Sequence, residues 1–242
     1  ELRTHYGKIG AIWFDGWWDQ DINPDFDWQL PEQYALIHRL QPACMIGNNH
    51  HQVPFEGEDF QMFERDLPGE NKSGLSGQDI SKLPLETCET MNGMWGYKVQ
   101  DQNYKTTKQL IHYLVNTAGK GANLLMNIGP QPNGELPATA VQRLKEMGEW
   151  MQVYGSTIRA TKAGDVPVQE WGATTRRDDK LYVHILNYDR RELYLPLQCK
   201  VVKAATFADG KRVGVTKTAE GVVLTLPEVP NGYDYVVELQ TK

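Results

Sequence analysis

The sequence predicts an α/β protein that ends in a small all-β domain. Short apolar runs alternate with helix-period segments up to about residue 160, and from about residue 164 the apolar residues recur with a period of two. Strand, helix and strand in this order imply right-handed crossovers between parallel strands. We therefore expect an α/β domain over residues 1–163 and a β domain over residues 164–242.

The α/β part contains short apolar runs, typical of buried strands, and three segments in which apolar residues recur at helical spacing, two of them after a proline. Residues 48–105 are rich in Gly, Asp, Glu and aromatic residues and are expected to be mostly irregular. So long a connection is expected to carry function. The expected strands are 9–14, 43–47 and 123–128, and the expected helices are 31–40, 110–118 and 137 to about 154.

The β part shows alternating runs separated by the turn signals Asp209-Gly210 and Asn231-Gly232. This pattern predicts an antiparallel sandwich. The expected strands are 181–186, 193–195, 222–226 and 233–239.

Composition excludes several classes of protein. A net charge of -6 without a basic cluster argues against nucleic-acid binding. Three widely spaced cysteines fit neither a disulfide framework nor a metal knuckle. No run approaches the ~18 apolar residues of a membrane span. Because the chain lacks an initial Met and a buried-strand pattern begins by Ile9, we expect residue 1 to be an internal point of a longer polypeptide.

Asp15 lies where the first expected strand ends, and in parallel α/β barrels ligands meet that end of the strands. It is flanked by Trp13, Phe14, Trp17 and Trp18. Flat aromatic faces pack against sugar rings, and a carboxylate supplies charge or a nucleophile. The pattern favours a carbohydrate site, although an Asp that begins a turn beside core tryptophans fits the same residues.

Glycoside hydrolysis requires two carboxyl groups, one ionised and one held protonated. The segment 48–105 offers many, and composition alone does not choose among them. The candidates are Glu56, Glu58, Asp59, Glu64, Asp66, Glu70, Asp79, Glu86 and Glu89.

Four segments, in order along residues 9–160, carry a resemblance: 12–16 (IWFDG), 59–69, 85–97 and 121–130. They resemble, in turn, the nucleophile strand, the acid/base segment, the stretch whose aromatic residue packs near the fucose methyl group, and the late barrel strand of glycoside hydrolase family 29, the α-L-fucosidases. The order of the four makes the resemblance far more specific than any single segment.

The resemblance implies the C-terminal part of a (β/α)8 (TIM-like) barrel followed by a small antiparallel β-sandwich. It implies a retaining exo-α-L-fucosidase that works through a covalent fucosyl-enzyme intermediate, with Asp15 as the nucleophile and Glu64 as the acid/base. Glu86 and Glu89 stay open as alternatives for the acid/base. No cofactor is expected.

Five residues are candidate sugar contacts: Trp13, Trp18, His50, His51 and Trp95. Trp95 takes the position of the aromatic residue near the fucose methyl group, with core packing as the alternative for it and for Trp13. His50 and His51 follow the second expected strand, where one of the pair would reach fucose hydroxyls. Adjacent residues on an extended chain point opposite ways and no HExxH spacing occurs, so no metal is expected.

The sequence departs from the family at its beginning, because the strands that precede the nucleophile strand are absent. We expect the upstream barrel half to be supplied in cis or by a second chain. The implied partner is a fucosylated oligosaccharide or glycoconjugate, and the resemblance favours a periplasmic or secreted location. Two rivals remain: another retaining glycosidase of the same barrel type, and a non-catalytic glycan-binding fragment.

Overall fold

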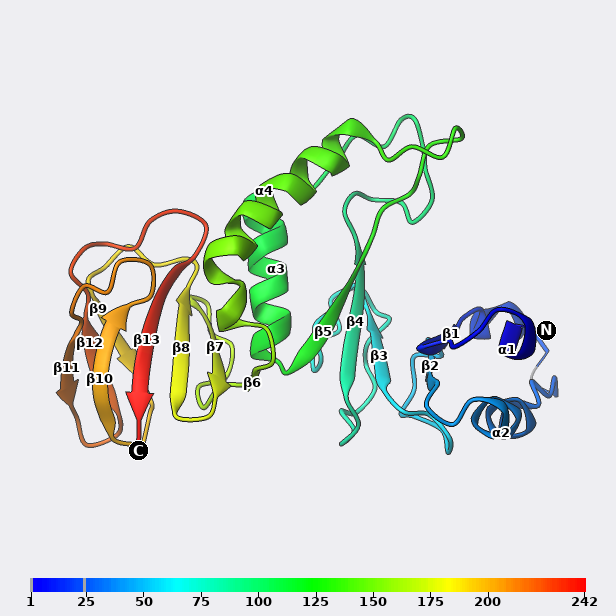
Figure 1. Cartoon of the computed structure of the whole chain (residues 1–242), viewed down its shortest axis with the longest axis horizontal. Coiled ribbons are helices and arrows are strands. Elements are labelled where there is room, and N and C mark those ends of the chain that lie inside the picture. Colours follow the sequence, from blue (N-terminus) through cyan, green and yellow to red (C-terminus); the bar gives the residue numbers. More distant parts are fainter. Residues whose placement is uncertain (1, 24) are drawn as a thin grey trace. The chain divides into compact units, whose positions relative to one another are not determined.

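The computed structural model describes residues 2–23 and 25–242, in two compact units that divide after Glu89 (Figure 1). The expected boundary at residue 163 falls inside the second unit and stays a prediction. Up to residue 90 the elements are α1 (Leu2–His5), β1 (Ala11–Phe14), η1 (Trp17–Gln20), α2 (Leu30–Leu40), β2 (Met45–Asn48), β3 (Gln61–Glu64) and β4 (Leu85–Thr90).

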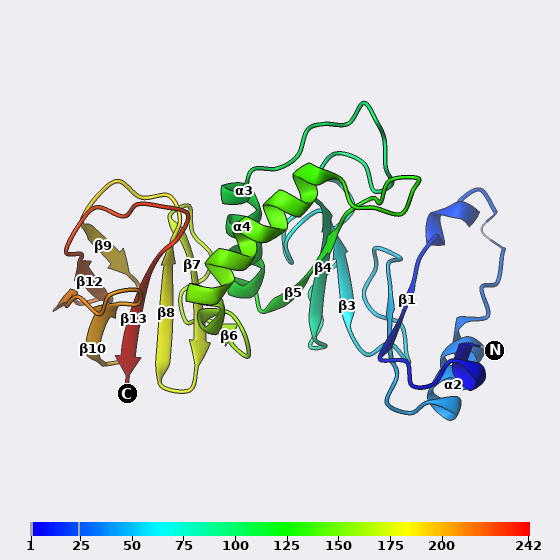
Figure 2. The same cartoon turned by 45° about the horizontal axis from the view of Figure 1, so that its top comes forward.

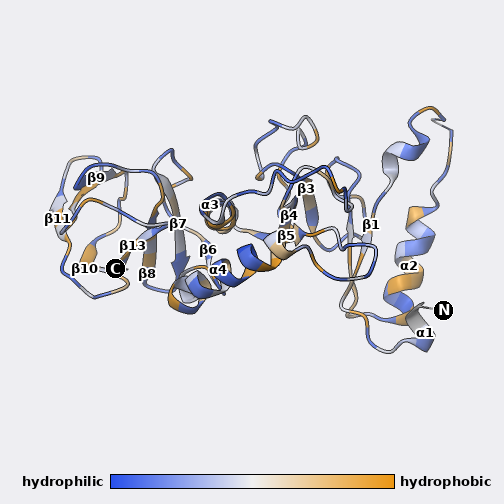
Figure 3. Cartoon of the chain, turned by 90° about the horizontal axis from the view of Figure 1, so that it is seen from above, coloured by the Kyte–Doolittle hydropathy of each residue, from blue (hydrophilic) through white to orange (hydrophobic). Residues whose placement is uncertain are grey.

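In the first unit, β1 and β2 form a parallel pair with Phe14 opposite Asn48. Helix α2 connects them, and hydrophilic and hydrophobic bands alternate along it (Figure 3). Its apolar side buries Tyr34 and Ile37 against Ile46 of β2. The expected strand, helix and parallel strand are confirmed.

Strands β3 and β4 form a second parallel pair, with Glu64 opposite Cys88, and lie side by side in two views (Figures 1 and 2). Residues 48–105 are mostly irregular, as expected, but they include these two strands, which the apolar pattern does not predict. The sequence of β3, Gln-Met-Phe-Glu, is half polar and so lacks the apolar run that would predict a strand, although all four residues are buried. Side-chain bonds satisfy those groups, as Gln61 accepts from the Ser81 N–H at 2.7 Å and donates to the Asp79 carbonyl at 2.8 Å.

Asp59 joins the two strand pairs. Its N–H donates to the Ile46 carbonyl at 2.8 Å, and its carboxylate accepts the Ile46 N–H at 2.8 Å. His38 of α2 reaches the same carboxylate at 2.9 Å. These bonds therefore fix the start of β3 against β2. The distance between residues at the carboxyl ends of the two strands depends on this contact.

In the second unit, α3 and α4 pack on an antiparallel sheet. Helix α3 begins with a capping box between Thr106 and Gln109, and α4 begins after Pro137, so both expected helices are confirmed. Their apolar sides bury Ile111 and Trp150 against Ala173 of the sheet. The elements are α3 (Thr107–Gly119), β5 (Ala122–Asn127), α4 (Ala138–Tyr154), η2 (Gly155–Thr157), β6 (Lys162–Ala163), β7 (Gly172–Arg177), β8 (Lys180–Ile185), β9 (Glu192–Leu195), β10 (Val201–Thr206), β11 (Gly214–Lys217), β12 (Val222–Thr225) and β13 (Tyr235–Thr241).

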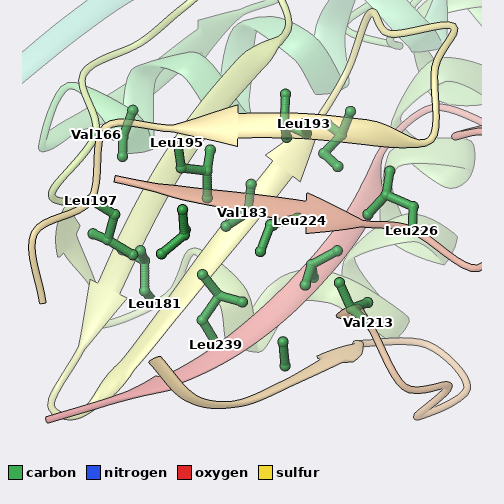
Figure 4. Packing of buried hydrophobic residues seen from close by; sticks show 14 of the residues in the cluster. Val166, Leu181, Val183, Leu193, Leu195, Leu197, Val213, Leu224, Leu226 and Leu239 are labelled. Carbon is green, nitrogen blue, oxygen red and sulfur yellow. The ribbon is translucent and has the colours of Figure 1, made fainter. Parts of the chain in front are cut away.

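The C-terminal strands form two antiparallel sheets, ordered β10-β13-β8-β7-β6 and β11-β12-β9. Alternate residues of both sheets point into one core, as the period-two pattern predicts (Figure 4). The core includes Val166, Leu181, Val183, Leu193, Leu195, Leu197, Val213, Leu224, Leu226 and Leu239.

Gly172→Ala is expected to destabilise this part by about 2–4 kcal/mol. Gly172 has φ 150°, and a Cβ there would lie 1.9 Å from the carbonyl oxygen of His184, so β7 and β8 would have to separate. Gly210→Ala is the matched control, because Gly210 also has positive φ but open space around it. Urea denaturation should show the larger loss at Gly172, and equal losses would contradict the steric argument.

Candidate active site

Asp15 directly follows β1, which ends at Phe14. Gly16 follows with φ 88°, a left-handed conformation that turns the chain into η1, and the space around it is open. Glycine is therefore favoured there by the backbone alone. The turn leaves the Asp15 carboxylate exposed at the carboxyl end of the strand, as the sequence predicts.

Asn49 follows β2 and connects the strand ends. Its backbone N–H donates to the Phe14 carbonyl at 2.9 Å, which extends the ladder between β1 and β2 by one bond. Its side-chain Nδ2 donates to Asp15 Oδ1 at 3.3 Å and to Glu64 Oε2 at 2.8 Å. One buried amide group thus brings Asp15 and Glu64 together.

Glu64 is the last residue of β3 and is 8% exposed. Ser76 holds its backbone from both sides, because the Glu64 N–H donates to Ser76 Oγ at 3.2 Å and Ser76 Oγ donates to the Glu64 carbonyl at 3.0 Å. Its Oε2 also lies 3.0 Å from His51 Nε2. The carboxylate is therefore held in place from its backbone and from one of its oxygens.

Two non-glycine residues beside the site have left-handed backbones, His51 at φ 58° and Arg65 at φ 61°. Such conformations cost of order 1–3 kcal/mol each and persist where the surroundings hold them. Arg65 is held by its N–H bond to the Cys88 carbonyl at 2.8 Å, and His51 by its contact with Glu64. Backbone strain therefore accompanies the residues that gather around Glu64.

The carboxyl groups of the site differ in the direction of their pKa shifts. The hydrogen bond from His51 is the largest effect on Glu64 and lowers its pKa, burial opposes this, and the Asn49 bond adds to the lowering. Burial raises the pKa of Glu86. Cys88 has its pKa raised to about 12, first by burial and then by the charges of Glu64, Glu86 and Asp15. The carboxyl groups of Glu64, Glu86 and Asp15 therefore all act on the Cys88 thiol.

Several other carboxylates of residues 48–105 are held by partners of their own. Asp66 accepts the N–H and hydroxyl of Ser73, and Glu70 pairs with Lys72. Glu89 is buried in β4. Among the described contacts, Glu64 is the carboxylate of this segment that shares a donor with Asp15.

His50 and His51 have different surroundings. His50 Nε2 lies 3.0 Å from Glu58 and its Nδ1 accepts the Gln52 N–H, so both ring nitrogens are occupied in the buried interior. Burial is the main cause that raises the pKa of Tyr34, which donates to Glu58 at 2.9 Å. Of the two histidines, His51 is the more exposed and the one that contacts Glu64.

The three candidate tryptophans lie in three settings. Trp18 is 50% exposed and stacks on His51 with the ring planes 7° apart and the centroids 6.2 Å apart. Trp13 is half-buried on β1, and alternation along a strand places it on the face opposite Phe14. Trp95 belongs to the second unit, where its carbonyl accepts from Asn127 at 2.8 Å. The structure therefore brings Trp18 to Glu64 through His51, and the roles of Trp13 and Trp95 stay predictions.

Cavities adjoin the end of β1. One of about 140 Å³ includes Asp15 in its lining. A larger one, of about 610 Å³, shares Trp17 and Trp28 with it and is also lined by Phe26 and Phe55. Of the four aromatic residues that flank Asp15 in the sequence, Phe14 and Trp17 line the smaller cavity with it.

Residues 1–156 of the chain match the family model described as Alpha-L-fucosidase. The chain belongs to this family, glycoside hydrolase family 29. Rat tissue alpha-L-fucosidase is 26% identical over 96% of the chain, and the alpha-L-fucosidase of Branchiostoma floridae is 33% identical over 74% of it. The match covers 51% of the rat protein and 39% of the Branchiostoma protein. The chain therefore spans about half the length of the rat relative and a smaller share of the Branchiostoma relative.

Solved α-L-fucosidases share the fold. Isoenzyme 1 from Paenibacillus thiaminolyticus superposes with a TM-score of 0.80 at 31% identity, over 100% of this chain and 60% of its own. A family 29 enzyme from Bacteroides thetaiotaomicron, trapped as a covalent intermediate with 2-fluoro-fucosyl fluoride, gives 0.84 at 24% identity, over 100% of this chain and 58% of its own. The family resemblance expected from the four sequence segments is confirmed.

Within residues 2–23 and 25–242, no three His, Cys, Asp or Glu side chains gather in a way that could hold a metal ion. In the same ranges, no helix has both the length and the apolar composition that crossing a membrane requires.

Asn49 and Glu58 are residues of the site region whose contacts the sequence does not predict. Glu58 supports His50, and Asn49 bonds both Asp15 and Glu64. A polar residue directly after a buried parallel strand was the available signal for Asn49, since the strand ends of an α/β fold gather at one edge.

Proposed function

We propose that the chain carries the two catalytic carboxylates of a retaining exo-α-L-fucosidase, which hydrolyses terminal α-L-fucosyl residues from glycans. The observation that carries this proposal is the amide of Asn49, which donates to Asp15 and Glu64 at once. Family membership gives the substrate class, and the trapped covalent intermediate of the Bacteroides relative supports a covalent mechanism.

The spacing of the two carboxylates supports retention. Asp15 Oδ1 lies 3.3 Å and Glu64 Oε2 lies 2.8 Å from the same nitrogen, so these two oxygens are no farther apart than the sum of the two distances. That limit is shorter than the about 6.5–9.5 Å that inverting enzymes need for a water molecule. A retaining pair, with carboxyl groups about 5–5.5 Å apart, fits within it.

In the first step, Asp15 attacks the anomeric carbon and forms a bond to it while the bond to the leaving oxygen breaks. Glu64 gives its proton to that oxygen. In the second step, Glu64 removes a proton from water, the water oxygen bonds to the anomeric carbon, and Asp15 leaves as a carboxylate. Two displacements at one carbon restore the original configuration.

The choice of Glu64 over Glu86 rests on position. A general acid should have a raised pKa, which burial gives to Glu86, whereas His51 and Asn49 lower the pKa of Glu64. The acid must also reach the bond that Asp15 attacks, and Glu64 shares a hydrogen-bond donor with Asp15. A bound sugar excludes water from Glu64, and this desolvation raises its pKa toward the working range.

Sugar contacts follow from the same site. The exposed ring of Trp18, stacked on His51, offers a flat face beside Glu64 for the C–H side of the sugar. His51, with one nitrogen on Glu64, fits a hydroxyl contact better than His50, whose nitrogens are both occupied. Trp13 and Trp95 are proposed as further contacts, and family membership is their support.

We further propose that residues 1–163 form the C-terminal part of a (β/α)8 barrel that needs its upstream half, in cis or as a second chain. Among the described residues, β1 pairs with one strand, β2. Barrel strands are paired on both edges and covered on both faces. The match to 51–60% of the rat and Paenibacillus enzymes supports the same view.

The test compares the chain alone with the chain joined to an upstream barrel half. We expect hydrolysis of 4-nitrophenyl α-L-fucoside by the joined protein, little activity on an aryl β-galactoside, and α-L-fucose as the first product by ¹H NMR. The chain alone is expected to lack activity and to unfold less cooperatively, because sugar ligands and a strand partner are missing.

Each rival predicts a different result. Faster hydrolysis of the β-galactoside would indicate another retaining glycosidase. Fucose binding without turnover in the joined protein would indicate a glycan-binding module. Release of β-L-fucose as the first product would show that the enzyme inverts the anomeric configuration rather than retaining it. Activity and cooperative unfolding of the chain alone would refute the need for an upstream half.

A further inference from the structure

We propose that Asn49 is the positioning residue that holds the nucleophile and the acid/base of this site at their working separation. The inference rests on the proposed function of Asp15 and Glu64. It adds a residue that touches both carboxylates and lies on a third strand end, between them in the chain.

The chemistry of the amide suits this role. An ionised carboxylate only accepts hydrogen bonds, so the Asn49 side chain must present Nδ2, and its two hydrogens serve one carboxylate each. This orientation leaves its Oδ1 buried without a partner among the described residues. An unsatisfied buried oxygen is costly, which indicates that the two donated bonds decide the orientation.

The backbone of Asn49 makes the amide a rigid reference. Its N–H donates to the carbonyl of Phe14, the residue directly before Asp15, and its side chain is among the most buried polar ones of the first unit. The amide therefore moves with β1 and β2, and the start of β3 is fixed to β2 through Asp59. A site held by buried groups on strand ends keeps the geometry that a two-step displacement needs.

The same contact distinguishes the two oxygens of Glu64. Oε2 receives the Asn49 hydrogen bond and lies 3.0 Å from His51 Nε2. While His51 Nε2 carries its hydrogen, Oε2 is occupied by two donors, so the proton of the neutral acid belongs on Oε1. Asn49 and His51 together thus leave Oε1 to face the leaving oxygen.

The charges around Glu64 set the expected pH response. His51 and Arg65 lower its pKa, and Asp15 and Glu86 lie in the same neighbourhood through Cys88, whose own pKa of about 12 keeps the thiol neutral. Asn49 lowers the pKa of Glu64 by donating to it. Removing this donor raises the pKa, and placing a third carboxylate there raises it further.

The experiment uses Asn49→Ala and Asn49→Asp in the joined protein, with Asn48→Ala as the matched control. Asn48 precedes Asn49 and is also buried, but its amide donates to the Tyr34 hydroxyl at 2.8 Å rather than to the site carboxylates. We expect kcat to fall about 10–100-fold in both Asn49 variants, with a smaller change in KM. The basic limb of the pH profile should move to higher pH, more in Asn49→Asp. Asn48→Ala should lower the melting temperature without moving that limb.

A second measurement does not depend on turnover. Titration of a ¹³C-labelled Glu64 carboxyl by NMR should give a higher pKa in Asn49→Asp than in the unchanged protein and in Asn48→Ala. An unchanged Glu64 pKa, or an equal shift from the Asn48 control, would overturn the role of Asn49. An inactive unchanged enzyme in which the shift is still observed would refute the proposed function and leave the positioning contact intact.

Discussion

Asp15→Ala is expected to lower kcat on 4-nitrophenyl α-L-fucoside by roughly 10⁴–10⁶-fold, the scale seen when a catalytic nucleophile is removed. The joined protein would then lack the group that attacks the anomeric carbon. Azide should restore part of the rate, because a small anion fits the space vacated beside Asn49 and attacks from the same face. The product of that single displacement should be β-L-fucosyl azide, detectable by ¹H NMR.

Asp19→Ala is the control for this prediction. Asp19 is an exposed acid on η1, four residues from Asp15, and its carboxylate accepts a hydrogen bond from the side chain of its neighbour Gln20 at 3.2 Å. Asp19→Ala should hydrolyse the substrate at the rate of the unchanged protein, and azide should not alter that rate. A slow 2-fluoro-fucosyl donor should also leave its adduct on the peptide that contains Asp15. Near-normal turnover by Asp15→Ala, or an adduct on another peptide, would reject the nucleophile assignment.

Glu64→Ala is expected to lower the rate on 4-methylumbelliferyl α-L-fucoside by about 10²–10⁴-fold, the usual contribution of a general acid. The loss should be smaller for a 2,4-dinitrophenyl leaving group, which departs without a proton. The basic limb of the pH profile should disappear, since that limb reports loss of the proton from Glu64. Azide should here yield α-L-fucosyl azide, because it attacks the fucosyl-enzyme in place of water.

Glu86→Ala decides between the two candidate acids. Burial raises the pKa of Glu86, so it is the residue that pKa alone would choose. If Glu64 is the acid, Glu86→Ala should keep both the basic limb and the unchanged ratio of rates on the two leaving groups. If the dependence on the leaving group instead appears in Glu86→Ala, the acid/base role passes to Glu86.

The sequence predicts β1, α2 and β2 well because their apolar patterns are clear. The strands are short apolar runs, and α2 repeats apolar residues at helical spacing between two prolines. The position of Asp15 follows from this, since a residue directly after a parallel strand lies at the edge where strand ends gather.

Such a pattern does not predict strand β3, and it does not select Glu64 among the carboxylates. The strand is buried yet polar, because its side chains bond to loop backbones whose arrangement is tertiary. Glu64 could be selected only through family resemblance, and its tie to Asp15 runs through Asn49, 15 residues earlier in the chain. A hydrogen bond between separate strand ends leaves no periodic trace in the sequence.

The left-handed backbones at His51 and Arg65 bear on how this protein would respond to selection for heat resistance. Asparagine and glycine adopt that conformation more readily than histidine or arginine, so replacements at these two positions would relieve strain and raise stability. At position 51 the same change would remove the imidazole from Glu64. Position 51 is therefore one where thermostability and turnover would be selected in opposite directions.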